Sequence, residues 1–237
     1  TISFSIIGYI DDMLIVVKKK NDGLAPRKKL MLQILFSVIF YVLVKFIYED
    51  INYIYIPGLE YQLNISYLYM VFVVFWQTGF SNAVNLTDGL DGLATSVTII
   101  TSSTFALLAY KENNFPIFVF CLVLVGALIG FLLFNKNPAK IFMGDTGSLA
   151  LGGILAAISI ILHKEIAFIF IGLVYILETL SVIIQVAYFK KTGKRIFKMS
   201  PLHHHFELSG YGEVKTVHLF VIIALISSGV GYFLGVI

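Results

Sequence analysis

Carboxylates, amides and histidines gather in four short stretches of this sequence, and their types suit the handling of phosphate groups. The first stretch is Asp11-Asp12, in YIDDMLIVVKKK. Both acids follow an apolar segment and would sit at the negative C-terminal end of its helix, where two adjacent like charges repel each other. They therefore need a cationic partner, either a lysine such as Lys18 or Lys19 or a metal ion. A solvated acidic helix end is the plainer alternative.

The second stretch, NAVNLTDGLDGLA, repeats an amide or a carboxylate every three residues. These residues are Asn82, Asn85, Asp88 and Asp91. On a helix each step of three turns the side chain by about −60°, so the four would form one oxygen-rich face over about half of the circumference. The stretch lacks the spacing and the distal Glu of an EF-hand loop. A capping and turn segment is the alternative.

The third stretch, FMGDTGS, places Asp145 and Thr146 just before an apolar helix that begins near Gly147. Backbone N–H groups at a helix N-terminus attract phosphate, and the flanking glycines permit close approach. A carboxylate beside phosphate needs a divalent cation between them. Mg²⁺ suits this role because it binds one or two carboxylates together with substrate phosphates. An ordinary N-cap aspartate is the alternative.

The fourth stretch is SPLHHHFELSGYGE, which contains His203, His204 and His205. Consecutive histidines do not converge on one metal as two histidines four residues apart on a helix do. Imidazole N–H groups that donate to an anionic substrate fit the pattern better, and a solvated loop is the alternative.

Glu178 and Gln185 lie within an apolar span. An ionised Glu there is costly, so Glu178 should face other helices, neutral or paired.

The composition shows which elements must position these residues. Hydrophobic residues make up 58% and charged residues 13% of 237, which is too apolar for a soluble domain of this size. The net charge of +3 is too small to indicate nucleic acid. Apolar runs of spanning length occur at Leu30–Tyr48, Ser66–Ser81, Leu93–Tyr110, Phe115–Phe134, Gly147–Leu162, Ile166–Phe189 and Thr216–Ile237. With a half-length run at Ile2–Ile10, the sequence predicts an all-α polytopic membrane protein of about seven full transmembrane helices plus one partial.

The basic residues orient these helices. Fourteen of the 17 Lys and Arg residues fall in connections on one side, which the positive-inside rule makes cytoplasmic. All four polar stretches lie on that side. On the other side, Asn52–Asn64 alternates apolar and polar residues around Pro57-Gly58, which favours a small extracytoplasmic β-hairpin. The abrupt start at Thr1 suggests that the beginning of the chain is missing.

Together, acids, glycines and basic loops at the inner membrane surface indicate a Mg²⁺-dependent membrane phosphotransferase. The chain has no GxxxxGK[ST] motif, which excludes a P-loop NTPase. A cation transporter that uses intramembrane acids is the alternative from another class, and it predicts Glu178 at the transport site.

At these motifs the chain resembles the polyprenyl-phosphate N-acetylhexosamine-1-phosphate transferases, from Gly8 to about Lys215. NAVNLTDGLDGLA and FMGDTGS mark the superfamily, and ETLSVIIQV followed by SPLHHHFE resembles its peptidoglycan branch. The resemblance implies a single integral-membrane domain over 1–237, lacking the family's N-terminal helices, in the bacterial cytoplasmic membrane. It implies transfer of phospho-MurNAc-pentapeptide from UDP-MurNAc-pentapeptide to undecaprenyl phosphate, giving lipid I and UMP. GlcNAc-1-phosphate transfer is the nearest alternative, and HHHFE argues against it.

The resemblance also assigns roles. It implies that Asp145 binds Mg²⁺ with Asn85 as a second ligand, and that Asp11 and Asp12 lie at the reacting phosphates. A carboxylate would either act as base or form a covalent intermediate, and Asp11 as base is favoured. Lys19, Asp88 and Phe142 resemble the lining of a uridine pocket, with Phe142 stacking on uracil. Other positions that resemble the substrate site are Arg27, Asp91, Asn135, Gln185, His203, His204 and His205. A homodimer stays open.

Overall fold

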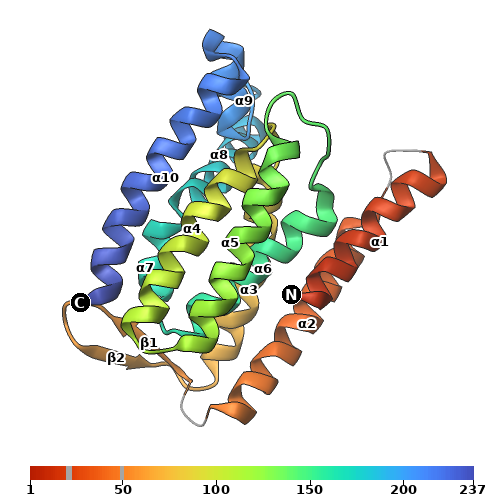
Figure 1. Ribbon diagram of the computed structural model, residues 1–237. Coiled ribbons are helices and arrows are strands. Elements are labelled where there is room, and N and C mark those ends of the chain that lie inside the picture. Colours follow the sequence, from red (N-terminus) through yellow and green to blue (C-terminus); the bar gives the residue numbers. More distant parts are fainter. Residues whose placement is uncertain (20–22, 49–50) are drawn as a thin grey trace. The chain divides into compact units, whose positions relative to one another are not determined.

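The computed structural model describes residues 1–19, 23–48 and 51–237 (Figure 1). Lys20, one of the basic residues counted above, lies outside the described residues. The elements are α1 (Ile2–Lys18), α2 (Pro26–Ile47), β1 (Tyr53–Ile56), β2 (Tyr61–Asn64), α3 (Leu68–Thr87), α4 (Leu93–Lys111), α5 (Phe115–Asn135), α6 (Gly144–Ile161), α7 (Glu165–Ile171), α8 (Leu173–Thr192), α9 (Leu202–Phe206), the π-helical turn η1 (Glu207–Tyr211) and α10 (Glu213–Val236).

The backbone forms two compact units. The first comprises residues 1–85, 143–168 and 234–237, and the second comprises residues 86–142 and 169–233. Within the described ranges, β1 and β2 are the only strands. They pair antiparallel, with Tyr53 opposite Asn64, and Gly58 has the positive φ of 80° that a Pro-Gly type II turn requires. The predicted all-α class and the predicted hairpin are both confirmed.

Six helices of the described chain are long and apolar enough to cross a membrane: α2, α4, α5, α6, α8 and α10. The predicted polytopic membrane protein is therefore confirmed. Helix α3 covers the predicted span Ser66–Ser81 but does not belong to this group, because Gln77, Asn82 and Asn85 lower its hydropathy.

Two helices have bounds in the structure that differ from the predicted ones. The span Ile166–Phe189 is not continuous, because the chain leaves helical geometry at Gly172 and forms α7 and α8 on either side. Helix α1 does not end near Ile10, because the apolar run MLIVV continues it to Lys18. Asp11 and Asp12 therefore lie inside a helix, and their predicted place at its C-terminal end is wrong.

The predicted helical face of Asn82, Asn85, Asp88 and Asp91 is also only partly correct. Asn82 and Asn85 lie on α3, which ends at Thr87. Asp88 and Asp91 lie in the turn that follows, because Gly92 takes a positive φ of 76° and interrupts the helical backbone before α4 begins. The turn alternative describes these two acids correctly.

Helix α6 is the centre of the first unit, and its residues from Ser148 to Ile160 are mostly buried. Helix α3 is fastened to it by hydrogen bonds from Trp76 Nε1 to Ser159 Oγ (2.9 Å) and from Ser81 Oγ to the carbonyl of Leu149 (3.0 Å). Helix α1 packs along α6 as well. Gly8 makes this approach possible, because a Cβ at position 8 would overlap the backbone carbonyl of Asp145.

We expect Gly8→Ala to lower the free energy of unfolding by about 1–3 kcal/mol, because the added methyl group would push α1 away from α6. Gly126→Ala, in α5, is the matched control, since no atom lies within 4 Å of the position that its Cβ would take. Thermal unfolding of both variants in detergent measures the difference. Equal unfolding midpoints for the two variants would contradict the close packing of α1 on α6.

Candidate active site

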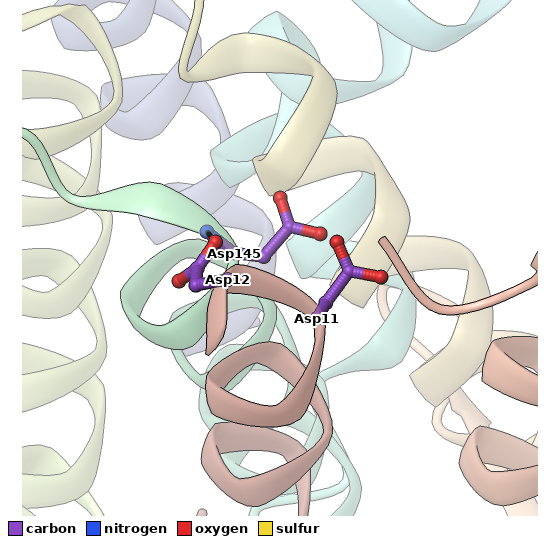
Figure 2. Close-up of side chains that lie close together, drawn as sticks. All are labelled: Asp11, Asp12 and Asp145. Atoms are coloured by element: carbon purple, nitrogen blue, oxygen red, sulfur yellow. Dashed lines mark hydrogen bonds between the residues drawn. The ribbon is translucent and has the colours of Figure 1, made fainter. Parts of the chain in front are cut away.

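Three carboxylates meet in the first unit, where α1 lies against the start of α6. Asp11 and Asp12 come from α1 and Asp145 from the first turn of α6 (Figure 2). One oxygen from each carboxylate lies within 4.8 Å of the others. Acids separated by 133 positions in the sequence are therefore brought together by one helix–helix contact.

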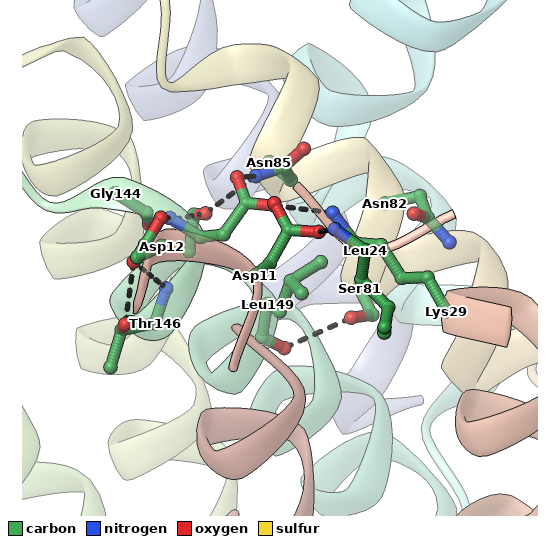
Figure 3. A network of polar contacts seen from close by, with 12 residues as sticks. Asp11, Asp12, Leu24, Lys29, Ser81, Asn82, Asn85, Gly144, Thr146 and Leu149 are labelled. Atoms are coloured by element: carbon green, nitrogen blue, oxygen red, sulfur yellow. Dashed lines mark hydrogen bonds and ion pairs between the residues drawn. The ribbon is translucent and has the colours of Figure 1, made fainter. Parts of the chain in front are cut away.

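Asp12 is bound to the N-terminus of α6. Its carboxylate accepts hydrogen bonds from the backbone N–H groups of Asp145 (3.2 Å) and Thr146 (2.9 Å) and from the Thr146 hydroxyl (2.5 Å) (Figure 3). Helix α6 begins at Gly144, so Asp145 lies in its first turn rather than before it or at its N-cap. The N–H groups that the sequence suggested for phosphate thus bind a carboxylate from another helix, which takes the place of an N-cap.

Asp145 is held between a cation and an amide. The Lys29 ammonium contacts Asp145 Oδ2, and Asn85 Nδ2 donates to Asp145 Oδ1 at 2.6 Å. Asn85 also donates to Ser148 Oγ at 2.9 Å. These contacts fix the orientation of the Asp145 carboxylate.

Asp11 lines a cavity of about 970 Å³ in the first unit. Asp11 is 8% exposed, and its Oδ1 accepts a hydrogen bond from the backbone N–H of Leu24 at 2.8 Å. Burial raises the pKa of Asp11 above its usual value, and the Leu24 hydrogen bond opposes this effect. The cavity is also lined by Lys18, Lys28 and Lys29, and by the apolar Leu14, Ile15 and Leu30. It therefore combines an anion-attracting wall with an apolar one.

The donor set fits a divalent cation. Among the described residues, one ammonium, that of Lys29, forms an ion pair with the cluster of three carboxylates, through Asp145, so it offsets only part of their negative charge. Oxygen ligands of this kind are those that Mg²⁺ and Ca²⁺ prefer. Asp145 is the member of the cluster placed to hold such an ion, because the Asp12 oxygens are occupied by the first turn of α6.

The resemblance assigns Lys19 and Arg27 to the substrate site. Lys19 is the C-cap of α1, Arg27 is the second residue of α2, and both are exposed.

The second unit contains the remaining predicted residues. Asp91 Oδ2 accepts from the backbone N–H of Ala139 at 2.8 Å, and Asp88 lies in the same turn. Asn135 is buried, accepts from Thr95 at 2.6 Å and donates to the carbonyl of Ile141 at 3.0 Å. These contacts hold the loop between α5 and α6.

Phe142 lies near the end of that loop, two residues before α6 begins, and is 78% exposed. An exposed aromatic ring next to a fastened loop is available for stacking on a flat ligand.

The three histidines have three different environments. His203 is buried, and its Nδ1 lies 3.1 Å from Oε2 of the fully buried Glu178. His204 Nδ1 lies 3.0 Å from Glu207, and His205 Nδ1 accepts from the backbone N–H of Lys198 at 3.1 Å. The prediction that Glu178 faces other helices, neutral or paired, is confirmed by its contact with His203 of α9. Since Nδ1 of His205 accepts, its Nε2 carries the proton and is the available donor.

Gln185 holds the chain that leads to the histidines. Its Oε1 accepts from the backbone N–H groups of Ile196 and Phe197, both at 3.0 Å, and its Nε2 donates to the Phe197 carbonyl at 3.0 Å. The side-chain amide of Gln185 therefore fastens a loop to α8.

Known proteins match this chain over its whole length. The profile described as glycosyl transferase family 4 matches residues 1–163. The phospho-N-acetylmuramoyl-pentapeptide-transferase of Staphylococcus carnosus is 55% identical over 239 residues, which cover 100% of this chain and 74% of that protein. Proteins of the same name from Staphylococcus saprophyticus and Staphylococcus aureus are 55% and 54% identical, with the same coverage. The chain belongs to the phospho-N-acetylmuramoyl-pentapeptide-transferase family. The resemblance carried by its motifs is confirmed, and neither alternative function is favoured.

Sequence reasoning did not identify two residues of α2 that lie beside the carboxylate cluster, Lys29 and Gln33. Lys29 was counted only as one of the basic residues that orient the membrane helices. Gln33, one turn later on α2, is buried and its Oε1 accepts from Asn82 at 3.0 Å. A glutamine within the apolar run LMLQILF is the signal that could have identified this face of α2 as turned inward.

We expect Asp12→Ala to loosen the start of α6, because three hydrogen bonds to its first turn are lost. The free energy of unfolding should fall by about 0.5–2 kcal/mol, as for the loss of a capping residue. Hydrogen–deuterium exchange at the Asp145 and Thr146 amides should become faster, whereas Met13→Ala, an exposed neighbour on α1, should leave it unchanged. Unchanged exchange in Asp12→Ala would show that Asp12 does not cap α6.

Proposed function

We propose that this protein transfers phospho-MurNAc-pentapeptide from UDP-MurNAc-pentapeptide to undecaprenyl phosphate, giving lipid I and UMP. The name of its relatives describes this transfer of a phospho-N-acetylmuramoyl-pentapeptide group. The observation that carries the proposal is the carboxylate cluster of Asp11, Asp12 and Asp145 beside a cavity with basic and apolar walls. Such a cavity suits an acceptor that joins a phosphate to a long apolar chain.

The reaction exchanges one phosphoanhydride bond for another. An oxygen of the lipid phosphate attacks the phosphorus that bears the sugar, a new P–O–P bond forms, and the bond to UMP breaks with UMP as leaving group. Because the bond formed and the bond broken are of one kind, no ATP is needed. The protein has to neutralise charge and align two phosphates, which are the main tasks in phosphoryl transfer.

Mg²⁺ bound at Asp145, with Asn85 as second ligand, would supply charge neutralisation for the diphosphate. In the structure the Asn85 amide nitrogen faces Asp145. A half-turn of that amide would bring its oxygen to the same place. Lys29, already beside Asp145, adds a positive charge at this point.

We assign the base to Asp11 rather than Asp12. The Asp12 oxygens already accept hydrogen bonds from the first turn of α6, whereas Asp11 opens onto the cavity. Asp11 would take the proton from the lipid phosphate, and Lys18 and Lys28 in the same cavity would hold its remaining charge. The apolar Leu14, Ile15 and Leu30 would contact the first part of the lipid chain. This arrangement supports direct attack rather than a covalent aspartyl intermediate.

We assign the nucleotide to residues that the resemblance gives to a uridine pocket: Lys19, Asp88 and Phe142. The exposure of the Phe142 ring and its place three residues before Asp145 in the sequence support stacking on uracil. His204 and His205 are the accessible members of the histidine run and would donate to the anionic donor substrate. Arg27, Asp91, Asn135, Gln185 and His203 complete the proposed substrate-site residues.

We also propose that the protein lies in the bacterial cytoplasmic membrane with these residues at the cytoplasmic face. The supporting observation is the charge asymmetry, since 14 of the 17 Lys and Arg residues fall in connections on one side. A homodimer stays a prediction.

We expect the protein to release UMP from UDP-MurNAc-pentapeptide in the presence of undecaprenyl phosphate and Mg²⁺. Asp145→Asn keeps the size of the side chain and removes its charge, so turnover should fall by at least about 100-fold, corresponding to the loss of several kcal/mol of transition-state stabilisation. Thermal unfolding of the variant serves as the control for folding. Near-normal turnover in Asp145→Asn would remove Asp145 from the reaction.

The donor sugar is tested in parallel. Lipid product from UDP-GlcNAc, with none from UDP-MurNAc-pentapeptide, would overturn the proposed substrate while leaving the reaction type in place.

A further inference from the structure

Two carboxylates and one amide join three separate segments of the second unit. Glu213, the first residue of α10, accepts from the backbone N–H of Asp91 through Oε1 (2.8 Å) and from Asn137 Nδ2 through Oε2 (2.7 Å). Asn137 Nδ2 also lies 3.3 Å from Asp91 Oδ2. The turn after α3, the loop after α5 and the start of α10 are thus fastened at one point.

The contacts of Asp91 extend this fastening to the middle of the loop. Asp91 Oδ2 accepts from the backbone N–H of Ala139 at 2.8 Å. Glu213 therefore acts on the loop in two ways, directly through Asn137 and indirectly by fixing the backbone of Asp91.

The other end of the loop is held by two further hydrogen bonds. Asn135 donates to the carbonyl of Ile141, and the N–H of Lys140 donates to the carbonyl of Phe134 at 2.7 Å. The residue that follows Ile141 is Phe142, which is 78% exposed. The position of this ring depends on the loop behind it, because few contacts of its own hold an exposed side chain in place.

We propose that Glu213 is a positioning residue that sets the place of Phe142 for a nucleotide base. Glu213 is the last residue of the stretch SPLHHHFELSGYGE, which by itself gave it no role, and its part in the reaction rests on the proposed function. The plainer alternative is an acid in the first turn of α10 that interacts favourably with the helix dipole. That alternative needs only a negative charge near the N-terminus, whereas the positioning role needs both oxygens at their present reach.

Two substitutions separate these interpretations. Glu213→Asp keeps the charge in the first turn but shortens the side chain by one carbon, so it cannot span Asp91 and Asn137. Glu213→Gln keeps the length but turns an amide N–H toward the donor of Asn137. Lys215→Ala, an exposed residue on the same turn of α10, is the matched control.

Under the positioning role, Glu213→Asp and Glu213→Gln should both raise the KM for UDP-MurNAc-pentapeptide by about threefold to tenfold, the effect of losing a hydrogen bond. The kcat at saturating donor should stay within about twofold of the parent, and Lys215→Ala should change neither. Amide exchange at Asp91 and Ala139 should become faster in both Glu213 variants.

A normal KM and unchanged exchange in Glu213→Asp would overturn the proposal in favour of the dipole interpretation. If the parent protein produces no UMP, the proposed function fails, but the exchange at Asp91 and Ala139 still decides whether Glu213 fastens the loop. If the parent protein is active and exchange rises with an unchanged KM, the loop is fastened but does not serve the nucleotide, and the positioning role fails.

Discussion

The central constraint on the candidate active site is that helix packing brings three mutually repelling carboxylates together. Asp11, Asp12 and Asp145 offer one oxygen each within 4.8 Å, and like charges at this distance strongly disfavour one another unless positive charge lies among them. Gly8 allows α1 to come close enough to bring two of the acids to the third. Lys29 and the N–H groups at the start of α6 compensate part of the charge. The negative charge that these groups leave uncompensated would attract a divalent cation to the site.

The two adjacent acids of α1 have different roles. Asp12 is occupied by the first turn of α6 and so ties the two helices together at the point where Asp145 must be placed. Asp11, one residue earlier on the helix, points to the cavity with its lysines and apolar wall. A pair of carboxylates that looks redundant in the sequence thus supplies one structural group and one group that can meet a substrate.

Much of the fold could be predicted from the sequence, because residue types and hydropathy indicate which segments must be helical, turned or buried. The apolar spans, the hairpin at Pro57-Gly58 and the paired Glu178 follow from the costs of exposing apolar groups and of burying charge. The predictions that failed concern residues whose position or role is set by packing between segments distant in the sequence. Nothing in YIDDMLIVV indicates that Asp12 caps a helix 133 positions away. A prediction from spacing alone continued α3 through Asp91, whereas the backbone conformation at Gly92 ends that helical face. Lys29 and Gln33 gain their importance only from their partners on other helices.

Direct measurement of divalent cation binding is the most incisive test of the account, because it does not depend on the substrate. Mn²⁺, which electron paramagnetic resonance detects, can be titrated into the purified protein and then competed with Mg²⁺. The carboxylate cluster predicts one saturable Mn²⁺ site per chain, displaced by Mg²⁺ and lost when Asp11 and Asp145 are both replaced by asparagine. Absence of saturable binding, or binding that survives this double replacement, would contradict the central claim.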